Sequence, residues 1–443
     1  MPSSASVVEN TWYPVADIFG SDNRYVSQGI LQKRLAVTGE GLKRSLGLRA
    51  LPIAVEERSG SLMFRAAGIA GAVHLLGTNL QIVPKFFDKG DTSNDWNISL
   101  LSIVRRARRK HFTYSPIRRL GLQRSTFIDH VALAFIDSLP KSNAADPIRT
   151  YRTVEESILV LRGRLSMGRQ IRSVLRGGYK LECDIDYLDP DNQFNQLLHW
   201  AARRFAMFVS DPRLRSSILQ TLEYLPPISG EGKLPVRLPL SAPPQYQPYA
   251  ESLEIASQLA SGFTHSHGSG IYDGYGFLLN MEKIFEAFIE RTMGRCAAKR
   301  ASWVSKPQES RLYALACRQG LKSYFTRPDN ALYVNGKASL LIDAKYKSFI
   351  EAEEKTKLPQ NSDLYQMFAS LVAHDCTRGL LVYPRMIDDP SSFTNIPAAW
   401  TVVHGGTGLK VTAVTLDLTA LTSTNAFDEL EANFSTVVQL AME

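Results

Sequence analysis

The chain has 443 residues, of which 44% are hydrophobic and 21% are charged, and its formal net charge is +8. This composition is typical of a folded protein and excludes a disordered or fibrous one. The length predicts two or three domains. The sequence has no run of about eighteen apolar residues, so we expect neither a membrane span nor a membrane partner.

The N-terminal residues and the cysteines indicate in which cellular compartment the protein is found. The first residues lack the basic-then-apolar layout of a signal peptide. The four cysteines are scattered, with no C-x-x-C pair, which argues against a zinc site or a disulfide framework. We therefore expect a cytoplasmic protein.

Positive charge is concentrated in two tracts. They include Arg105, Arg106, Arg108 and Arg109 in the first, and Arg162 and Arg164 in the second. Such clusters suit a polyphosphate partner, because bound arginines release counterions from the phosphates. DNA is the expected partner, and a solvated helix face or an acidic protein neighbour is the alternative.

The organisation along the chain predicts an α/β protein. Residues 1–95 show short apolar runs separated by glycine and serine, which indicates a β-rich domain. Residues 96–225 have mostly helical spacing. Residues 226–248 hold many prolines and are predicted to be a linker. Residues 249–443 alternate helices with buried strands, which indicates a mixed sheet covered by helices.

One buried strand ends in residues that can carry chemistry. Ser339 to Ile342 form an apolar run, followed by Asp343 and Lys345. Because residues i and i+2 of a strand point to the same face, this acid and this amine should emerge together. With a further acid nearby, they could hold Mg²⁺ and position a water beside a phosphate.

The further acid is Asp329, with thirteen residues between it and Asp343. The intervening segment predicts a hairpin with its turn at Asn335-Gly336. A two-residue loop would pair Val334 with Lys337 and leave Asp329 on the wrong face. We therefore predict a three-residue loop or an equivalent bulge, which brings Asp329 across from Asp343. A capping role for Asp329 and a surface ion pair for Asp343 are the alternative.

Two predicted helices flank this hairpin in sequence. Glu282 and Glu286 lie one turn apart on the first, where Glu286 could reach the rim of a metal site or both could be solvated. The second helix begins near Asp363, which is expected to cap it, and carries Gln366.

In this order, the motifs resemble a known nuclease core. Phe285-Glu286, Pro328-Asp329, Asp343-Ala344-Lys345-Tyr346-Lys347 and Asp363-Leu364-Tyr365-Gln366-Met367 resemble the PD-(D/E)xK core, and specifically the McrC family of the modification-dependent McrBC restriction systems. Upstream, Leu80 to Lys85, Leu161 to Leu165 and Asp191 to Leu198 are similar to other parts of that family. The first 25 or so residues and the proline-rich stretch look like departures from it.

The resemblance implies a restriction-endonuclease-like mixed sheet flanked by helices at the C-terminus, after a β-rich N-terminal domain and a helical middle region. It implies that Asp329 and Asp343 are ligands of Mg²⁺ or Mn²⁺, that Lys345 orients the attacking water, and that Glu286 supports the site. Tyr346, Lys347 and Gln366 are implied as supporting residues, Gln366 by contacting DNA or a neighbouring catalytic group.

The resemblance also implies a partner, a hexameric McrB-like AAA+ GTPase onto which the N-terminal part docks and whose hydrolysis the chain stimulates. The chain has no G-x-x-x-x-G-K-[ST] motif, so we expect it to bind no nucleotide itself. The expected function is cleavage of modified DNA with that partner. A non-catalytic adaptor with a decayed core is the alternative. An RNA-directed role is less favoured because no RNP-type aromatic motif is visible.

Overall fold

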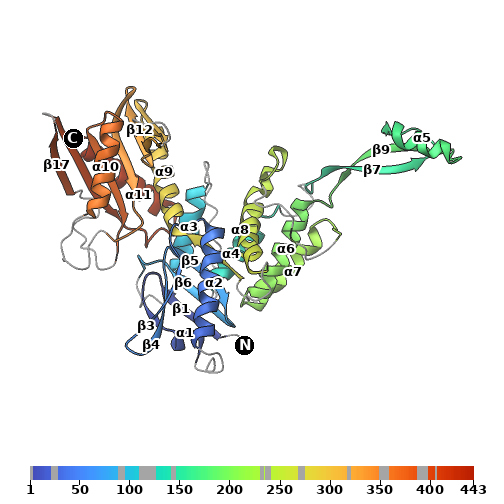
Figure 1. Ribbon diagram of the computed structural model, residues 1–443, viewed down its shortest axis with the longest axis horizontal. Coiled ribbons are helices and arrows are strands. Elements are labelled where there is room, and N and C mark those ends of the chain that lie inside the picture. The colour runs from blue at the N-terminus through green and yellow to red at the C-terminus, as the bar shows by residue number, and fades with distance from the viewer. Residues whose placement is uncertain are drawn as a thin grey trace. The chain divides into compact units, whose positions relative to one another are not determined.

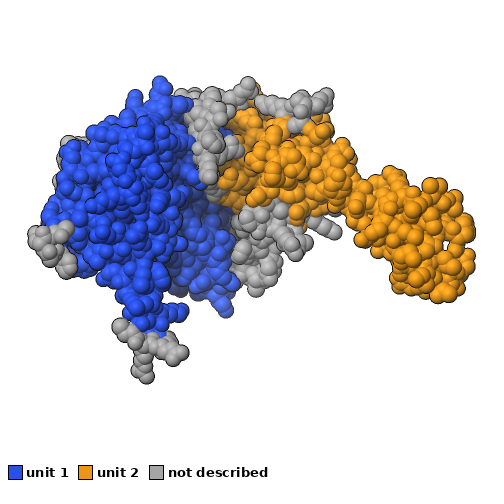
Figure 2. Space-filling model, turned by 90° about the horizontal axis from the view of Figure 1, so that it is seen from above, with its two compact units in different colours: residues 1–130, 265–443 blue, residues 131–264 orange. Residues whose placement is uncertain are grey.

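The protein is described by a computed structural model covering residues 3–20, 28–87, 95–108, 126–140, 146–229, 234, 241–267, 275–316, 321–348, 359–386, 398–404 and 407–443. It forms two compact units, coloured separately in Figure 2. Unit 1 contains residues 1–130 and 265–443, and unit 2 contains residues 131–264. No helix in the described part of the chain is long and apolar enough to cross a membrane.

The N-terminal part of unit 1 is built on a four-stranded sheet with the order β1-β6-β5-β10 (Figure 1). Its last strand comes from far along the sequence and pairs antiparallel with β5. A smaller sheet, β2-β4-β3, and two helices complete this part. The bounds are β1 Ser3–Val8, β2 Tyr13–Pro14, α1 Val15–Phe19, α2 Gln28–Leu46, β3 Ile53–Arg58, β4 Ser61–Ala66, β5 Ile69–Leu75, β6 Thr78–Val83 and β10 Tyr275–Asn280.

The C-terminal part of unit 1 is a six-stranded mixed sheet with the order β11-β14-β15-β16-β18-β17. Its central strands β15, β16 and β18 are parallel, and the flanking strands are antiparallel. A two-stranded sheet of β12 and β13 lies against α10. The strands are β11 Trp303–Pro307, β12 Arg311–Ala314, β13 Tyr324–Thr326, β14 Asn330–Val334, β15 Lys337–Ala344, β16 Arg378–Pro384, β17 Ala398–His404 and β18 Thr407–Leu416.

Helices cover both faces of the six-stranded sheet, as the alternation of its buried strands requires. On one face, α10 (Asn361–Ala373) packs its Met367 and Leu371 against Leu341 and Leu381. Gly379 of β16 permits this close approach, because a Cβ there would lie 2.7 Å from the Met367 side chain. Helices α9 (Met281–Ala298) and α11 (Thr424–Met442) contact the same central strands.

A buried ionic cluster ties three helices of unit 1 together. Arg106 of α3 (Asp95–Arg108) is 4% exposed and is paired with the carboxylate of Glu431 on α11. Arg295 and Lys299 of α9 also contact this carboxylate, each at 3.2 Å. Burial raises the pKa of Glu431, but Arg106 and Lys299 reverse the effect and lower it. The prediction that Arg106 binds DNA is therefore wrong, because its guanidinium is buried and already paired.

Unit 2 combines helices with a small antiparallel sheet of order β7-β9-β8. These strands fall in the region expected to be mostly helical, and the sequence analysis did not predict them. The long strands β7 and β9 extend beyond α6 and α7 and carry α5 near their far end (Figure 1). The bounds are α4 Phe127–Ser138, β7 Thr150–Ile158, β8 Arg164–Leu165, α5 Met167–Leu175, β9 Leu181–Asp189, α6 Gln193–Phe208, α7 Pro212–Tyr224, a 3₁₀ turn Pro244–Tyr249 and α8 Ala250–His267.

The ionic cluster yields a stability prediction. Glu431→Ala leaves buried Arg106 without its counter-charge, and breaking a buried ion pair costs about 3–5 kcal/mol. We expect this loss in the free energy of unfolding, measured by urea denaturation. Glu429→Ala, on an exposed position of the same helix, should change it by no more than about 0.5 kcal/mol. Equal effects of the two substitutions would contradict the assignment.

Candidate active site

The hairpin of β14 and β15 sets the position of the two candidate acids. Val334 pairs with Lys337, so the loop has two residues, and the predicted three-residue loop is wrong. Asn335 and Gly336 both have positive φ, 51° and 80°, as a type I′ turn requires. Further along, the register shifts by one residue at a bulge that contains Ser339. The equivalent bulge that the sequence allowed is therefore confirmed.

The bulge places Asp329 on the same face of the sheet as Asp343. Beyond it, Asn330 stands opposite Ile342, so the next pair along the ladder is Asp329 and Asp343. Both side chains are buried, with Asp329 9% and Asp343 4% exposed. Without the extra residue, the two carboxylates would point to opposite faces of the sheet.

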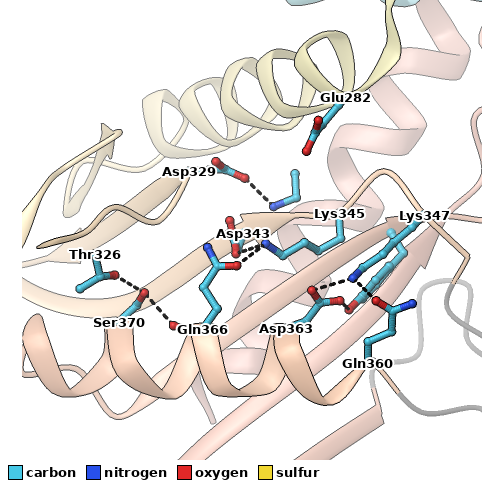
Figure 3. A network of polar contacts seen from close by, with 12 residues as sticks. Glu282, Thr326, Asp329, Asp343, Lys345, Lys347, Gln360, Asp363, Gln366 and Ser370 are labelled. Atoms are coloured by element: carbon cyan, nitrogen blue, oxygen red, sulfur yellow. Dashed lines mark hydrogen bonds and ion pairs between the residues drawn. The ribbon is translucent and has the colours of Figure 1, made fainter. Parts of the chain in front are cut away.

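Asp329 is held in a crowded, partly desolvated position (Figure 3). The amide of Ala344 donates to its Oδ2 at 2.7 Å, and Nε2 of Gln308 donates to its Oδ1 at 3.3 Å. Burial, and then the charge of Asp343 and a hydrogen bond to it, raise the pKa of Asp329 to about 8. The pair therefore carries a proton near neutral pH unless a cation replaces it.

Lys345 emerges on the same side as Asp343. Its Nζ lies 2.7 Å from Oδ2 of Asp343 and donates to Oε1 of Gln366 at 2.9 Å. Burial alone would lower the pKa of Lys345, but the adjacent carboxylate outweighs this effect and raises it. Lys345 is thus an ammonium at neutral pH, and it has three N–H donors. Two of them are committed here, which leaves one for a bound substrate or water.

A second lysine–carboxylate pair stands beside the first. Nζ of Lys347 lies 2.8 Å from Oδ1 of Asp363 and also donates to Oε1 of Gln360. The hydroxyl of Tyr383 donates to the other oxygen of Asp363 at 2.8 Å. The expectation that Asp363 caps α10 is wrong, since the N-cap position is Gln360 and Asp363 lies in the first turn. Its carboxylate is directed to the strand end instead.

Helix α9 contributes two glutamates to the same space. Glu282 lies above Asp329 (Figure 3) and pairs with Arg49 at 3.3 Å. Glu286 lies one turn further along α9. Burial, followed by the charges of Glu282 and Asp343, raises the pKa of Glu286. An additional cation in this space would relieve the repulsion among these acids.

These side chains line one cavity of about 260 Å³ in unit 1. The sequence analysis gave no role in this site to Arg49, Glu282, Gln308, Arg327 or Asp363. Arg49 and Gln308 lie on segments distant from the motifs, so no local spacing could have indicated them. Glu282 is one helical turn from Glu286 and Arg327 is close to Asp329 in sequence, so for these two a local signal was present. The lining residues are Arg49, Glu282, Glu286, Gln308, Arg327, Asp329, Asp343, Ala344, Lys345, Tyr346, Lys347, Asp363 and Gln366.

The donor set fits a cation that retains water. No group of three or more His, Cys, Asp or Glu residues in the described ranges could form a protein-only metal site. Mg²⁺ does not require one, because it usually binds one or two carboxylates and keeps several waters. Asp329 and Asp343 supply two carboxylates whose mutual repulsion favours such an ion.

Three other arginines predicted to bind DNA, Arg105, Arg162 and Arg164, do not line this cavity. Arg105 is partly buried on α3, while the side chain of Arg108 and the whole of Arg109 lie outside the described residues. In unit 2, Arg162 lies over the ring of Tyr187, and Arg164 pairs with Asp184 at 3.1 Å.

Residues 64–384 match the family described as "McrBC 5-methylcytosine restriction system component". No protein of curated function matches the sequence. A solved structure, the half-complex from a tetradecameric assembly of Thermococcus gammatolerans McrB AAA+ hexamers with bound McrC, is similar in fold. Its TM-score is 0.66 at 17% identity, with 99% of this chain and 100% of that chain covered.

A second structure, the Thermococcus gammatolerans McrBC complex, has a TM-score of 0.46 at 19% identity, with 68% and 90% of the two chains covered. The family match spans well over half of the chain and includes Asp329, Asp343, Lys345 and Gln366. The resemblance inferred from the motifs is confirmed at the level of the family: this chain belongs to the McrBC restriction-system family.

Proposed function

We propose that the chain is the Mg²⁺-dependent DNA endonuclease subunit of a McrBC-type restriction system, and that it cuts modified DNA together with a McrB-like AAA+ GTPase. The observation that carries this proposal is the convergence of Asp329, Asp343 and the paired Lys345 on one cavity. Two buried acids can hold a divalent cation, and a protonated amine can stabilise the charge that develops on a phosphate during phosphodiester hydrolysis.

Each group has a distinct part in the proposed reaction. Asp329 and Asp343 would hold the cation, which when bound offsets charge on the phosphate and lowers the pKa of a water. Lys345 remains protonated, so it acts as a hydrogen-bond donor rather than as a base. Asp343 and Gln366 fix its Nζ, so that its remaining donor can be directed to the phosphate or to the attacking water.

The proposed partner is suggested by the family and by the similar solved structure, which contains McrB AAA+ hexamers with bound McrC. We expected residues 1–95 to provide the docking surface. The larger exposed apolar surface is on the hairpin of β7, β9 and α5. No side chain of α5 is buried, and Leu175 and Tyr179 are each 81% exposed. Exposed apolar patches mark interaction sites, so we assign docking to this hairpin.

The adaptor alternative makes a different demand on the site. In a nuclease core that has lost its activity, we would expect one of these charged residues to be replaced, or apolar side chains to fill the cavity. Instead, Asp343, Lys345 and Gln366 form a connected chain of polar contacts at 2.7 and 2.9 Å. This arrangement favours the catalytic reading.

Cleavage by site variants tests the proposed catalysis. We expect Asp343→Asn and Lys345→Ala each to lower the cleavage rate at least about 100-fold, because each removes preorganised charge at the phosphate. The assay contains the partner, nucleotide and Mg²⁺, and EDTA should abolish cutting. Lys337→Ala, exposed at the other end of β15, is the matched control. Partner stimulation without any metal-dependent cutting by the unaltered chain would favour the adaptor.

Metal binding should depend on pH through Asp329. Its proton must leave before a cation binds, and its pKa is about 8. We expect the increase in melting temperature caused by MgCl₂ to grow from pH 6 to about pH 8 and then to level off. Asp329→Asn cannot titrate, so its smaller increase should be the same at every pH. A wild-type increase that stays constant over this range would refute the assignment of Asp329.

Partner docking is tested on the hairpin. Leu175→Asp places a charge on the proposed interface and should weaken partner binding at least about tenfold, since a central contact contributes about 1.4 kcal/mol or more. The chain should still fold, because Leu175 is exposed. Leu219→Asp, on an exposed position of α7 in the same unit, is the control. Gel filtration with the partner measures both, and equal binding would exclude this surface.

A further inference from the structure

Tyr346 connects the candidate catalytic strand to the N-terminal sheet. It stands between Lys345 and Lys347, immediately after β15. Its hydroxyl donates to Oε2 of Glu9 at 2.6 Å, across a sequence separation of 337 residues. Glu9 follows β1, so this bond joins the four-stranded and the six-stranded sheets of unit 1 at the edge of the cavity.

Lys85 holds the same tyrosine at two further points. Its Nζ donates to the backbone carbonyl of Tyr346 at 2.8 Å and lies 4.0 Å from the centre of the ring. The rings of Phe86 and Phe285 pack against Tyr346 from the two sides of the junction. The hydroxyl, the ring and the main chain of this residue are therefore all fixed by other segments.

Glu9 is itself firmly oriented. It is 2% exposed, and it accepts hydrogen bonds from the amide of Gly68 at 2.8 Å and from the amide of Lys85 at 3.3 Å. A buried carboxylate is costly unless it is paired and hydrogen-bonded. Gly68 directly precedes β5 and Lys85 follows β6, so these two amides hold Glu9 against the N-terminal sheet and make it an anchor for Tyr346.

The consequence for the site follows from the covalent connection between Tyr346 and its two neighbours. Because Tyr346 is bonded directly to Lys345 and Lys347, fixing its hydroxyl, ring and carbonyl also limits the positions that the backbone of these two residues can take. Those two amines are the ones that contact Asp343, Gln366 and Asp363. The backbone here has little other support, since the amide of Lys345 donates to Val382 and that of Lys347 only to Lys345 within the same turn.

We propose that Glu9 and Lys85 are positioning residues that act through Tyr346 to hold Lys345 in its catalytic orientation. The N-terminal sheet then forms part of the nuclease site and is not only an accessory domain. This inference rests on the proposed nuclease function.

Kinetics of two variants test the inference. Tyr346→Phe removes one hydroxyl and keeps the ring, and Glu9→Gln removes the charge that fixes it. A displacement of about 1 Å at a catalytic group can cost about 100-fold in rate. We expect each variant to lower kcat by about 10-fold to 100-fold, with KM for DNA changed by less than about twofold. The assay uses the full chain with its partner, nucleotide and Mg²⁺.

Tyr333→Phe is the matched control, because Tyr333 is on β14 of the same sheet but does not line the cavity, and its hydroxyl donates to a carboxylate, that of Glu309, at 2.7 Å. It should leave kcat unchanged. If Glu9 acts only through Tyr346, the double variant should be no slower than Tyr346→Phe alone. Additive losses, or a Tyr333→Phe loss as large as that of Tyr346→Phe, would overturn the proposal.

Hydrogen exchange on the full chain without partner or metal gives a readout independent of activity. The amides of residues 345–348 should exchange faster in both variants than in the wild type, while those of β16 should not change. Unchanged exchange at 345–348, or faster exchange with wild-type kcat, would overturn the positioning role. A wild-type chain that never cuts DNA would instead overturn the proposed nuclease function.

Discussion

The repulsion between Asp329 and Asp343 is the constraint on which the rest of the site depends. Two carboxylates are buried next to each other, which raises the pKa of Asp329 to about 8. Such an arrangement is unfavourable unless a proton or a cation is shared between them. Lys345 supplies one positive charge, and the bulge in β15 is what forces the two acids onto one face. If these residues served only stability, apolar side chains would serve as well, because replacing a buried ion pair by well-packed apolar residues often leaves the stability unchanged or increases it.

Much of this site could be predicted from the sequence because its central part is local. The alternation of a buried strand places Asp343 and Lys345 together, and the Asn335-Gly336 turn fixes where the chain reverses. The exact loop length could not be predicted, because a two-residue loop with a bulge and a three-residue loop give the same final pairing. Only the backbone of Ser339 distinguishes them.

Other features could not be inferred because they depend on contacts distant in sequence. Arg106 lies in a run of basic residues, and nothing local shows that Glu431 will bury and neutralise it. Asp363 has the position of a helix cap, yet Lys347 and Tyr383 bind its carboxylate. Strand β7 exposes much of both its faces and lacks the apolar alternation by which a half-buried strand is recognised. Strand β9 does alternate apolar and polar residues from Leu181 to Tyr187, and the sequence analysis overlooked this signal.

The path of the chain through unit 1 explains how a distant sheet can take part in the chemistry. Strand β10 completes the N-terminal sheet and continues directly into α9, whose N-cap is Asn280 at the end of that strand. The same helix carries Glu282 and Glu286 to the cavity. The N-terminal sheet therefore fixes the start of α9 covalently and the end of β15 through Tyr346. A site assembled from both connections can be shifted by any force on that sheet.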